Sequence, residues 1–377
     1  VLLTTYGLIT SQVNLFLKSF DKLGFNFDYI FLDEGHKVKN PSIQLSQCLR
    51  QIPVHICKFI LTGTPIQNNL MELWSLFDYL FDGRLLGSSR AFKNEFENKI
   101  IRANERDASD FEKRLGHQIS LKLQKLIEPH LLRREKSVVL NASSSISISR
   151  KNDLIIWIKN SEKQHELYSE FLTSPEVRAV LNRSQSVLSA LTTLKQICSH
   201  PNLLTNGQKV TKLADIVKYS GKLAFLEILL KQLYAEKRRV LIFSQSVQML
   251  YLIGKILDSH CFKHLQIDGS ISDSRERQKL LDEFNAPNSK YFCFLLTSQV
   301  GGFGITLTSA DRVVVFDPSW NPSVDSQAVD RAYRIGQTKD VIVYRLISCG
   351  TIEEKVCYCP TICTLYYIII RFNNLQP

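Results

Sequence analysis

The sequence predicts an α/β protein in which parallel β-sheets form two lobes. The first observation is a set of short β-branched or aromatic runs, typical of buried strands, at 29–33, 58–61, 240–243, 292–297, 313–316 and 341–347. The second is that amphipathic, helix-like segments alternate with these runs, as in sheets joined by crossover helices. The third is that a long stretch of different character separates the first two runs from the other four. We therefore expect two sheets with helical insertions between them.

The sequence divides into four segments. Residues 1–136 hold the first two runs and end in a charged stretch, from Phe92, that is predicted to form a helical protrusion. Residues 137–215 begin with a serine-rich connector at 141–149 and continue as a helical insertion. Residues 216–356 hold the other strands, and residues 357–377 form an atypical apolar tail.

The composition favours an acidic partner and argues against a membrane anchor. The formal net charge of +11 favours a polyanion through phosphate neutralisation, although many basic proteins bind none. The apolar run 361–370 is about half of the ~20 residues needed to cross a bilayer. The nine cysteines are scattered without Cys-x-x-Cys pairs, which favours reduced thiols over a zinc site.

Two carboxylates, Asp33 and Glu34, end the first predicted strand. An aspartate at a strand end can hold Mg²⁺ through water, and the adjacent glutamate can orient or deprotonate an attacking water. The alternative is a solvated pair that starts a turn before Gly35. Because Gly35 and His36 follow directly, we favour the catalytic interpretation. Thr62 and Gly63 follow the next run, and there we expect a loop that senses a neighbouring site and passes movement on, or else a simple strand-to-helix turn.

The second lobe offers glycines and arginines. Three glycines at 301, 302 and 304 follow the run that ends at Thr297, and they permit a close backbone approach to a phosphate or ribose, or else a tight turn. Arg331 and Arg334 are three residues apart, so on a helix they would share a face with Gln327. Guanidinium groups can stabilise charge on a transferring phosphoryl group, although surface arginines on a solvated helix are commoner.

These runs resemble the catalytic core of the Snf2 family of superfamily-2 helicase-like ATPases. The resemblance covers roughly residues 1–356, in family order, at 33–36, 61–69, 72–78, 197–201, 301–307 and 330–337. Within the family, the runs at 85–87, 92–98 and 317–322 are most similar to the Cockayne-syndrome-B/PICH-like branch of DNA translocases.

The resemblance implies two RecA-like lobes that close on ATP and track along double-stranded DNA without separating its strands. It assigns the Mg²⁺ ligand to Asp33, the water-positioning role to Glu34 and the arginine fingers to Arg331 and Arg334. The residues expected at ATP are Thr62, Gly63, Gly304 and Gln327. The residues expected at DNA are Ser244, Gln245, Asp268, Gly269, Ser270, Thr297, Ser298 and Trp320. Nucleosomes or DNA-bound proteins are further expected partners, and the expected location is nuclear.

The sequence departs from the family pattern twice. The phosphate-binding loop, Gly-x-x-x-x-Gly-Lys-[Ser/Thr], occurs nowhere in it, and Gly221-Lys222 is only a partial imitation in the second lobe. We expect its place to lie before Val1, with the first lobe truncated, so residues 1–377 alone should not turn over ATP while the full protein does. The tail does not continue the charged helix expected after Lys355, and we expect a gene-model artefact there.

Two other functions stay open. A catalytically silent DNA-binding scaffold would fit the missing loop. An RNA helicase of the same superfamily is less favoured, because the run at 33–36, the run at 330–337 and the long insert at 92–215 are of the Snf2 type.

Overall fold

The computed structural model describes residues 1–17, 27–63, 70–105, 107–134, 149–182, 187–205, 213–271, 273–298 and 304–357. These residues form two compact units. The described residues up to Arg134 make up unit 1, and those from Ser149 to Cys357 make up unit 2. Each unit has its own hydrophobic clusters, so each buries apolar surface independently.

Unit 1 is built around two strands, β1 (Phe27–Asp33) and β2 (Val54–Leu61). They pair in parallel, with Asp33 beside Leu61, so the segments that follow both strands leave from the same end. The other elements of this part are α1 (Tyr6–Ser11), α2 (Val13–Leu17), η1 (Gly35–Val38), α3 (Gln44–Gln51) and α4 (Leu70–Phe81). One face of the pair packs Leu32 against α3 and α4, while Phe31 and Phe59 stack 4.8 Å apart on the exposed face.

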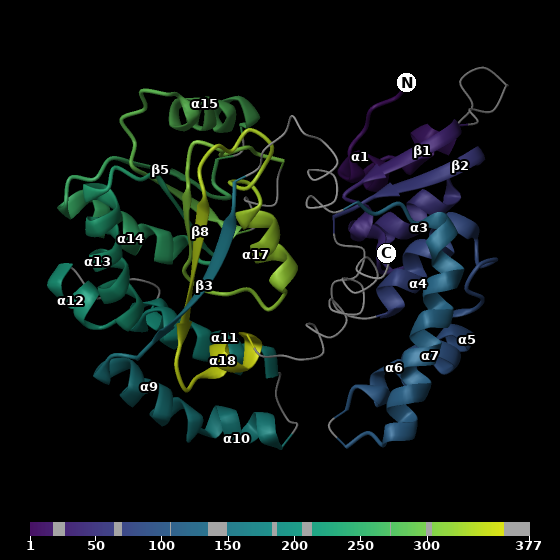
Figure 1. Ribbon diagram of the computed structural model, residues 1–377, viewed down its shortest axis with the longest axis horizontal. Coiled ribbons are helices and arrows are strands. Elements are labelled where there is room, and N and C mark those ends of the chain that lie inside the picture. The colour runs from purple at the N-terminus through teal and green to yellow at the C-terminus, as the bar shows by residue number, and fades with distance from the viewer. Residues whose placement is uncertain are drawn as a thin grey trace. The chain divides into compact units, whose positions relative to one another are not determined.

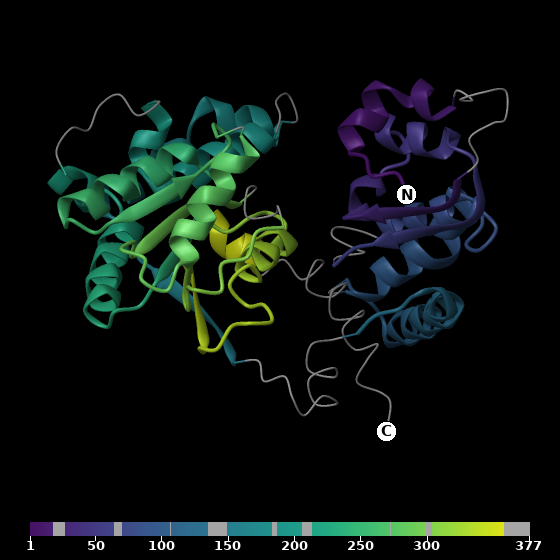
Figure 2. The same ribbon diagram turned by 90° about the horizontal axis from the view of Figure 1, so that it is seen from above.

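The charged stretch from Phe92 is helical, as predicted. It comprises the end of α5 (Ser89–Phe92), the π-helical turn η2 (Lys93–Glu97), α6 (Asn98–Ala103), α7 (Asp110–Ile127) and the 3₁₀ turn η3 (Glu128–His130). A capping box formed by Ser109 and Glu112 starts α7. A Cβ on Gly116 would lie 2.2 Å from Cβ of Ala103, so glycine lets α7 approach α6 closely. In Figure 2, α4 lies between β1 and these helices.

Unit 2 is a six-stranded parallel sheet of order β3-β8-β7-β4-β6-β5 (Figure 1). The strands are β3 (Lys151–Ile158), β4 (Val240–Ser244), β5 (His264–Ile267), β6 (Cys293–Thr297), β7 (Arg312–Val315) and β8 (Val341–Ser348). The sequence predicted β1, β2, β4, β6, β7 and β8, and these predictions are confirmed. It did not predict β5, or that β3, from the segment 137–215, would become the edge strand of this sheet.

Helices cover both faces of the sheet in unit 2 (Figure 1). Val240 and Ile242 of β4 face a core shared with α13 (Gly221–Ala235) and α14 (Val247–Ser259). Leu241 and Phe243 face a core shared with α15 (Ser274–Asn285) and α17 (Pro322–Val329). Because both faces are buried, the central strands are continuously apolar. The remaining helices are α9 (Glu162–Leu172), α10 (Pro175–Leu181), α11 (Val187–Ser199), η4 (Pro201–Thr205), α12 (Leu213–Lys218) and α18 (Ile352–Cys357). Within the described ranges, every helix is too short or too polar to span a membrane.

Candidate nucleotide and nucleic-acid site

The carboxylates of unit 1 stand where β1 ends. Asp33 is exposed, and its Oδ1 accepts a hydrogen bond of 3.0 Å from the backbone N–H of Glu34. Glu34 adopts the left-handed conformation, with φ 49°, which turns the chain sharply out of the strand. A Cβ on Gly35 would lie 2.5 Å from Cγ2 of Ile60, so only glycine lets this turn pack against β2. The two carboxylates are thus presented beside one another at the strand end.

His36 joins the carboxylates to the end of β2. Its Nδ1 lies 3.3 Å from Oε2 of Glu34 and 3.4 Å from Oγ1 of Thr62. Burial is the largest influence on the imidazole and lowers its pKa, against the opposing effect of Glu34. Gly63 is exposed, with open space where a Cβ would be. The two motifs of this lobe are therefore in contact through one histidine, and the rest of the second motif, 64–69, lies outside the described residues.

The expected DNA residues of unit 2 gather at the carboxyl edge of the sheet. Ser244 ends β4 beside Thr297, which ends β6, and Ile267 of β5 pairs with Leu296. The segments that follow these strands carry the candidates, so parallel pairing brings them to one edge. These are Ser244, Gln245, Asp268, Gly269, Ser270, Thr297 and Ser298.

Most of these side chains are committed to contacts within the protein. Asp268 accepts hydrogen bonds from the backbone N–H and the hydroxyl of Ser270, at 2.9 and 2.5 Å, and these bonds lower its pKa. Thr297 and Ser298 are buried, and no described group hydrogen-bonds Oγ of Ser298. Trp320, in the loop after β7, is 38% exposed. Gln245, Gly269 and Ser270 are exposed as well, but Trp320 is the candidate that offers an aromatic ring for a stacking contact.

The two arginines do not lie on a helix, contrary to the prediction. Helix α17 ends at Val329, and the chain continues in turns. In these turns the backbone N–H of Arg331 donates to the carbonyl three residues earlier, that of Ala328, at 3.2 Å. The carbonyl of Arg331 accepts a bond of 3.0 Å from the backbone N–H of Leu307, which pulls this segment out of helical geometry. Gln327 is still helical, so the three residues do not share a helix face.

The arginine segment packs against the residues that precede β7. Nη1 of Arg334 donates to Oγ1 of Thr306 at 3.1 Å, and the amide of Gln337 donates to the carbonyl of Ala310 at 2.9 Å. Arg331 is 5% exposed, whereas Arg334 is partly exposed. Gly304, in the stretch that precedes β7, is exposed. Glycines 301 and 302 lie outside the described residues. Of the two guanidinium groups, that of Arg334 is the more accessible to a ligand.

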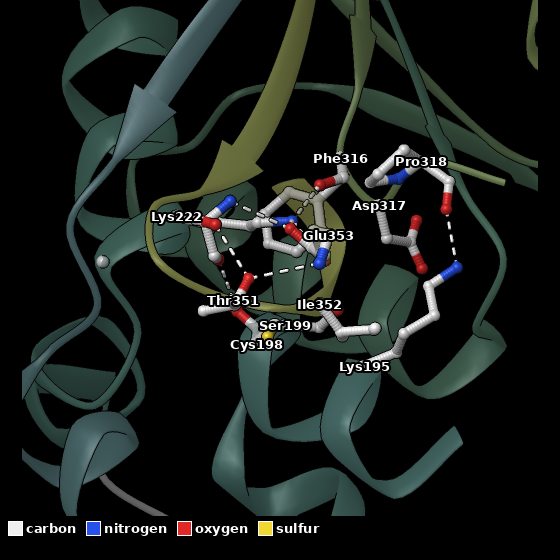
Figure 3. Close-up of polar contacts among 12 residues, drawn as sticks. Lys195, Cys198, Ser199, Lys222, Phe316, Asp317, Pro318, Thr351, Ile352 and Glu353 are labelled. Atoms are coloured by element: carbon white, nitrogen blue, oxygen red, sulfur yellow. Dashed lines mark hydrogen bonds and ion pairs between the residues drawn. The ribbon is translucent and has the colours of Figure 1, made fainter. Parts of the chain in front are cut away.

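Lys222, which follows Gly221 as in part of the phosphate-binding loop pattern, forms a buried ion pair with Glu353 (Figure 3). Its Nζ lies 2.8 and 2.7 Å from the two carboxylate oxygens of Glu353 and donates to the carbonyl of Phe316 at 2.9 Å. Both side chains are fully buried. A Cβ on Gly221 would lie 2.2 Å from the carbonyl oxygen of Lys159, so the glycine serves packing. This lysine is a structural residue of unit 2.

Two further aspartates of unit 2 are buried and were not singled out from the sequence. Asp317 accepts the backbone N–H of Gln245 at 2.9 Å, and burial raises its pKa to about 6. Asp325 accepts the backbone N–H of Ser319 at 2.8 Å, and burial likewise raises its pKa to about 6. The sequence feature that could have pointed to Asp317 is the run Asp317-Pro-Ser-Trp-Asn-Pro322, in which only the tryptophan was given a role.

We predict that Asp325→Asn stabilises unit 2 more at high pH than at low pH. The folded-state pKa lies above the ordinary value of 3.8, so folding takes up a proton and wild-type stability falls as the pH rises from about 4 to about 6. Asparagine removes this cost and keeps an acceptor for Ser319. The stability difference should grow by about 1–2 kcal/mol between about pH 5 and pH 7.5 in urea unfolding. A difference that is independent of pH would contradict this.

Comparison with known proteins decides the family. Residues 1–203 match the SNF2-related domain, and residues 221–336 match the helicase conserved C-terminal domain. The chain belongs to the Snf2 family. The sequence-based assignment to this family is confirmed, and the α/β architecture with parallel sheets agrees with it.

The relatives of this Snf2-family chain include repair and remodelling proteins. It is 42% identical to the mouse (Mus musculus) DNA excision repair protein ERCC-6-like, over 94% of this chain and 32% of that protein. It is 42% identical to Protein CHROMATIN REMODELING 24 of Arabidopsis thaliana, over 94% of this chain and 36% of that protein. It is 40% identical to human (Homo sapiens) DNA excision repair protein ERCC-6, over 93% of this chain and 24% of that protein. The chain therefore spans about a third or less of the length of these relatives.

A solved structure is similar to part of this chain. It is the crystal structure of the C-terminal part of the Fun30 ATPase domain, with a TM-score of 0.50 and 25% sequence identity. The similarity covers 56% of this chain and 88% of that one. This agrees with the RecA-like fold that the sequence predicted.

Proposed function

We propose that the chain belongs to the catalytic core of an ATP-dependent double-stranded DNA translocase that acts in DNA repair or chromatin remodelling in the nucleus. The observation that carries the proposal is the contact of His36 with both Glu34 and Thr62. It connects the residue pair suited to hydrolysis with the end of the neighbouring strand, so a change at one motif is transmitted to the other.

Magnesium and ATP fit the residues present in this Snf2-family core. The carboxylate of Asp33 is an exposed hard oxygen donor at a strand end, which suits Mg²⁺. Glu34 beside it can orient or deprotonate water, and Arg331 and Arg334 supply positive charge for a phosphoryl group. Bound Mg²⁺ would neutralise charge on the phosphates. Thr62, Gly63, Gly304 and Gln327 complete the proposed nucleotide contacts.

The proposed DNA contact is the carboxyl edge of the sheet in unit 2. It combines small hydroxyl residues after β4, β5 and β6 with the indole of Trp320. The formal net charge of +11 supports a nucleic-acid partner through counterion release. Nucleosomes or DNA-bound proteins would be met in the course of translocation along the duplex.

The function class is tested by phosphate release from the full-length protein with duplex DNA or with RNA of matched length. We expect stimulation by duplex DNA well above that by RNA, and no turnover by residues 1–377 alone, because the sequence contains no phosphate-binding loop to position the transferred group. Stimulation by RNA alone would favour the helicase alternative. Duplex binding without any turnover would favour the scaffold, and appreciable turnover by residues 1–377 would refute the inactivity of this part.

A further inference from the structure

The loop that carries Trp320 is held by a lysine from the helical insertion. Lys195 lies on α11, which ends within the 197–201 motif, and its side chain reaches the residues after β7 (Figure 3). We infer that Lys195 is a positioning residue that fixes the ring of Trp320. That this ring contacts duplex DNA rests on the proposed function.

One ammonium group makes both contacts. Nζ of Lys195 donates to the carbonyl of Pro318 at 2.6 Å and lies 4.9 Å from the centroid of the Trp320 ring. The first contact fixes the backbone two residues before the tryptophan, and the second holds the indole face by a cation–π interaction. Lys195 is 9% exposed while Trp320 is 38% exposed, so the lysine supports the ring and leaves part of it to solvent.

The backbone of this loop is braced independently of the ring. The side-chain amide of Gln245 donates to the carbonyls of Asp317 and Pro318, at 3.2 and 2.7 Å. The carboxylate of Asp325 accepts the N–H of Ser319. Removing the lysine therefore leaves the loop anchored at both ends but takes the charge away from the indole, which is the effect expected of a positioning residue.

Lys195 is itself held in place. The amide of Gln164 on α9 donates to the carbonyls of Ile197 and Cys198, both at 2.8 Å, which ties the end of α11 to α9. Burial lowers the pKa of Lys195, and the nearby carboxylates of Asp317, Glu353 and Asp325 oppose this effect. A fixed helix and neighbouring negative charge together keep the ammonium group over the ring.

The test uses residues 1–377 with all three tryptophans replaced by 5-fluorotryptophan. The fluorine resonance of Trp320 is assigned by its loss in Trp320→Phe. We expect Lys195→Met to shift or broaden this resonance and leave those of Trp74 and Trp157 unchanged. Lys195→Arg, which keeps a cation and a donor, should stay near wild type. Affinity for a duplex DNA oligonucleotide should fall about three- to tenfold in Lys195→Met.

The control is Lys231→Met, which removes the same charge from an exposed position on α13 and should leave the Trp320 resonance unchanged. An unchanged Trp320 resonance in Lys195→Met overturns the inference. If wild type binds DNA and Lys195→Met binds equally well, the DNA part is overturned. If the resonance responds but wild type binds no duplex, the positioning role stands and the proposed function fails. Should Lys195→Met not fold, Lys195→Gln carries the same comparison.

Discussion

Lys222→Met is expected to destabilise unit 2 by about 3–5 kcal/mol, because it leaves the charge of Glu353 buried without its partner. Both side chains are fully buried, and Glu353 also accepts the backbone N–H of Ser348 at 2.9 Å, which holds it in place. The carboxylate cannot turn to water without disrupting the start of α18. Urea unfolding followed by circular dichroism measures this loss in the transition of unit 2.

Replacement of both partners distinguishes a buried pair from simple loss of packing. Lys222→Met combined with Glu353→Leu should recover at least about 2 kcal/mol relative to Lys222→Met alone, since no uncompensated charge remains. Lys163→Met is the control, because Lys163 is 45% exposed in its pair with Glu166, so its loss should change the stability of unit 2 little. Equal losses in the double and single variants would show that the charges are not coupled.

Glu34→Gln is expected to lower DNA-stimulated phosphate release by the full-length protein by at least about 100-fold. Glutamine keeps the size of the side chain, and the left-handed turn at this position is set by the backbone, so the local structure should persist. The glutamine side chain cannot take a proton from the attacking water, and it has no negative charge with which to orient that water. Single-turnover phosphate release measures the effect, and ATP binding should be retained.

A matched glutamate in unit 1 supplies the control. Glu95 is exposed in the π-helical turn η2, away from β1, and Glu95→Gln should keep wild-type turnover. Loss of ATP binding together with turnover in Glu34→Gln would mean that the residue acts in binding. Wild-type turnover in Glu34→Gln would remove it from the proposed chemistry.

The strands that the sequence predicted are those with dense apolar runs. The central strands β4, β6 and β7 are buried on both faces, so their composition alone identifies them. Strand β3 begins with Lys151, Asn152 and Asp153 because it lies at the sheet edge, and this polar start resembles a loop. Strand β5 has only four residues and alternates in burial. Both depend on long-range pairing that local sequence does not encode.

The candidate site was predictable where residue type and strand end coincide, as at Asp33 and Glu34. The site was not predictable where contacts between distant parts of the chain determine the position of a side chain. The helical spacing of Arg331 and Arg334 was overridden by the bond from Leu307. The partner of Lys222 lies 131 residues away, and the contact of Lys195 with Pro318 spans 123 residues. Such pairs become visible only when the chain is folded.

In the proposed duplex-driven motor, Glu34 of unit 1 acts on the attacking water and Arg334 of unit 2 stabilises charge on the phosphoryl group. The most direct measurement is phosphate release by the full-length protein with saturating duplex DNA, compared among wild type, Glu34→Gln and Arg334→Ala. We expect strong stimulation in wild type and loss of at least about 100-fold in both variants, with duplex affinity unchanged. Turnover near wild type in either variant would contradict the account.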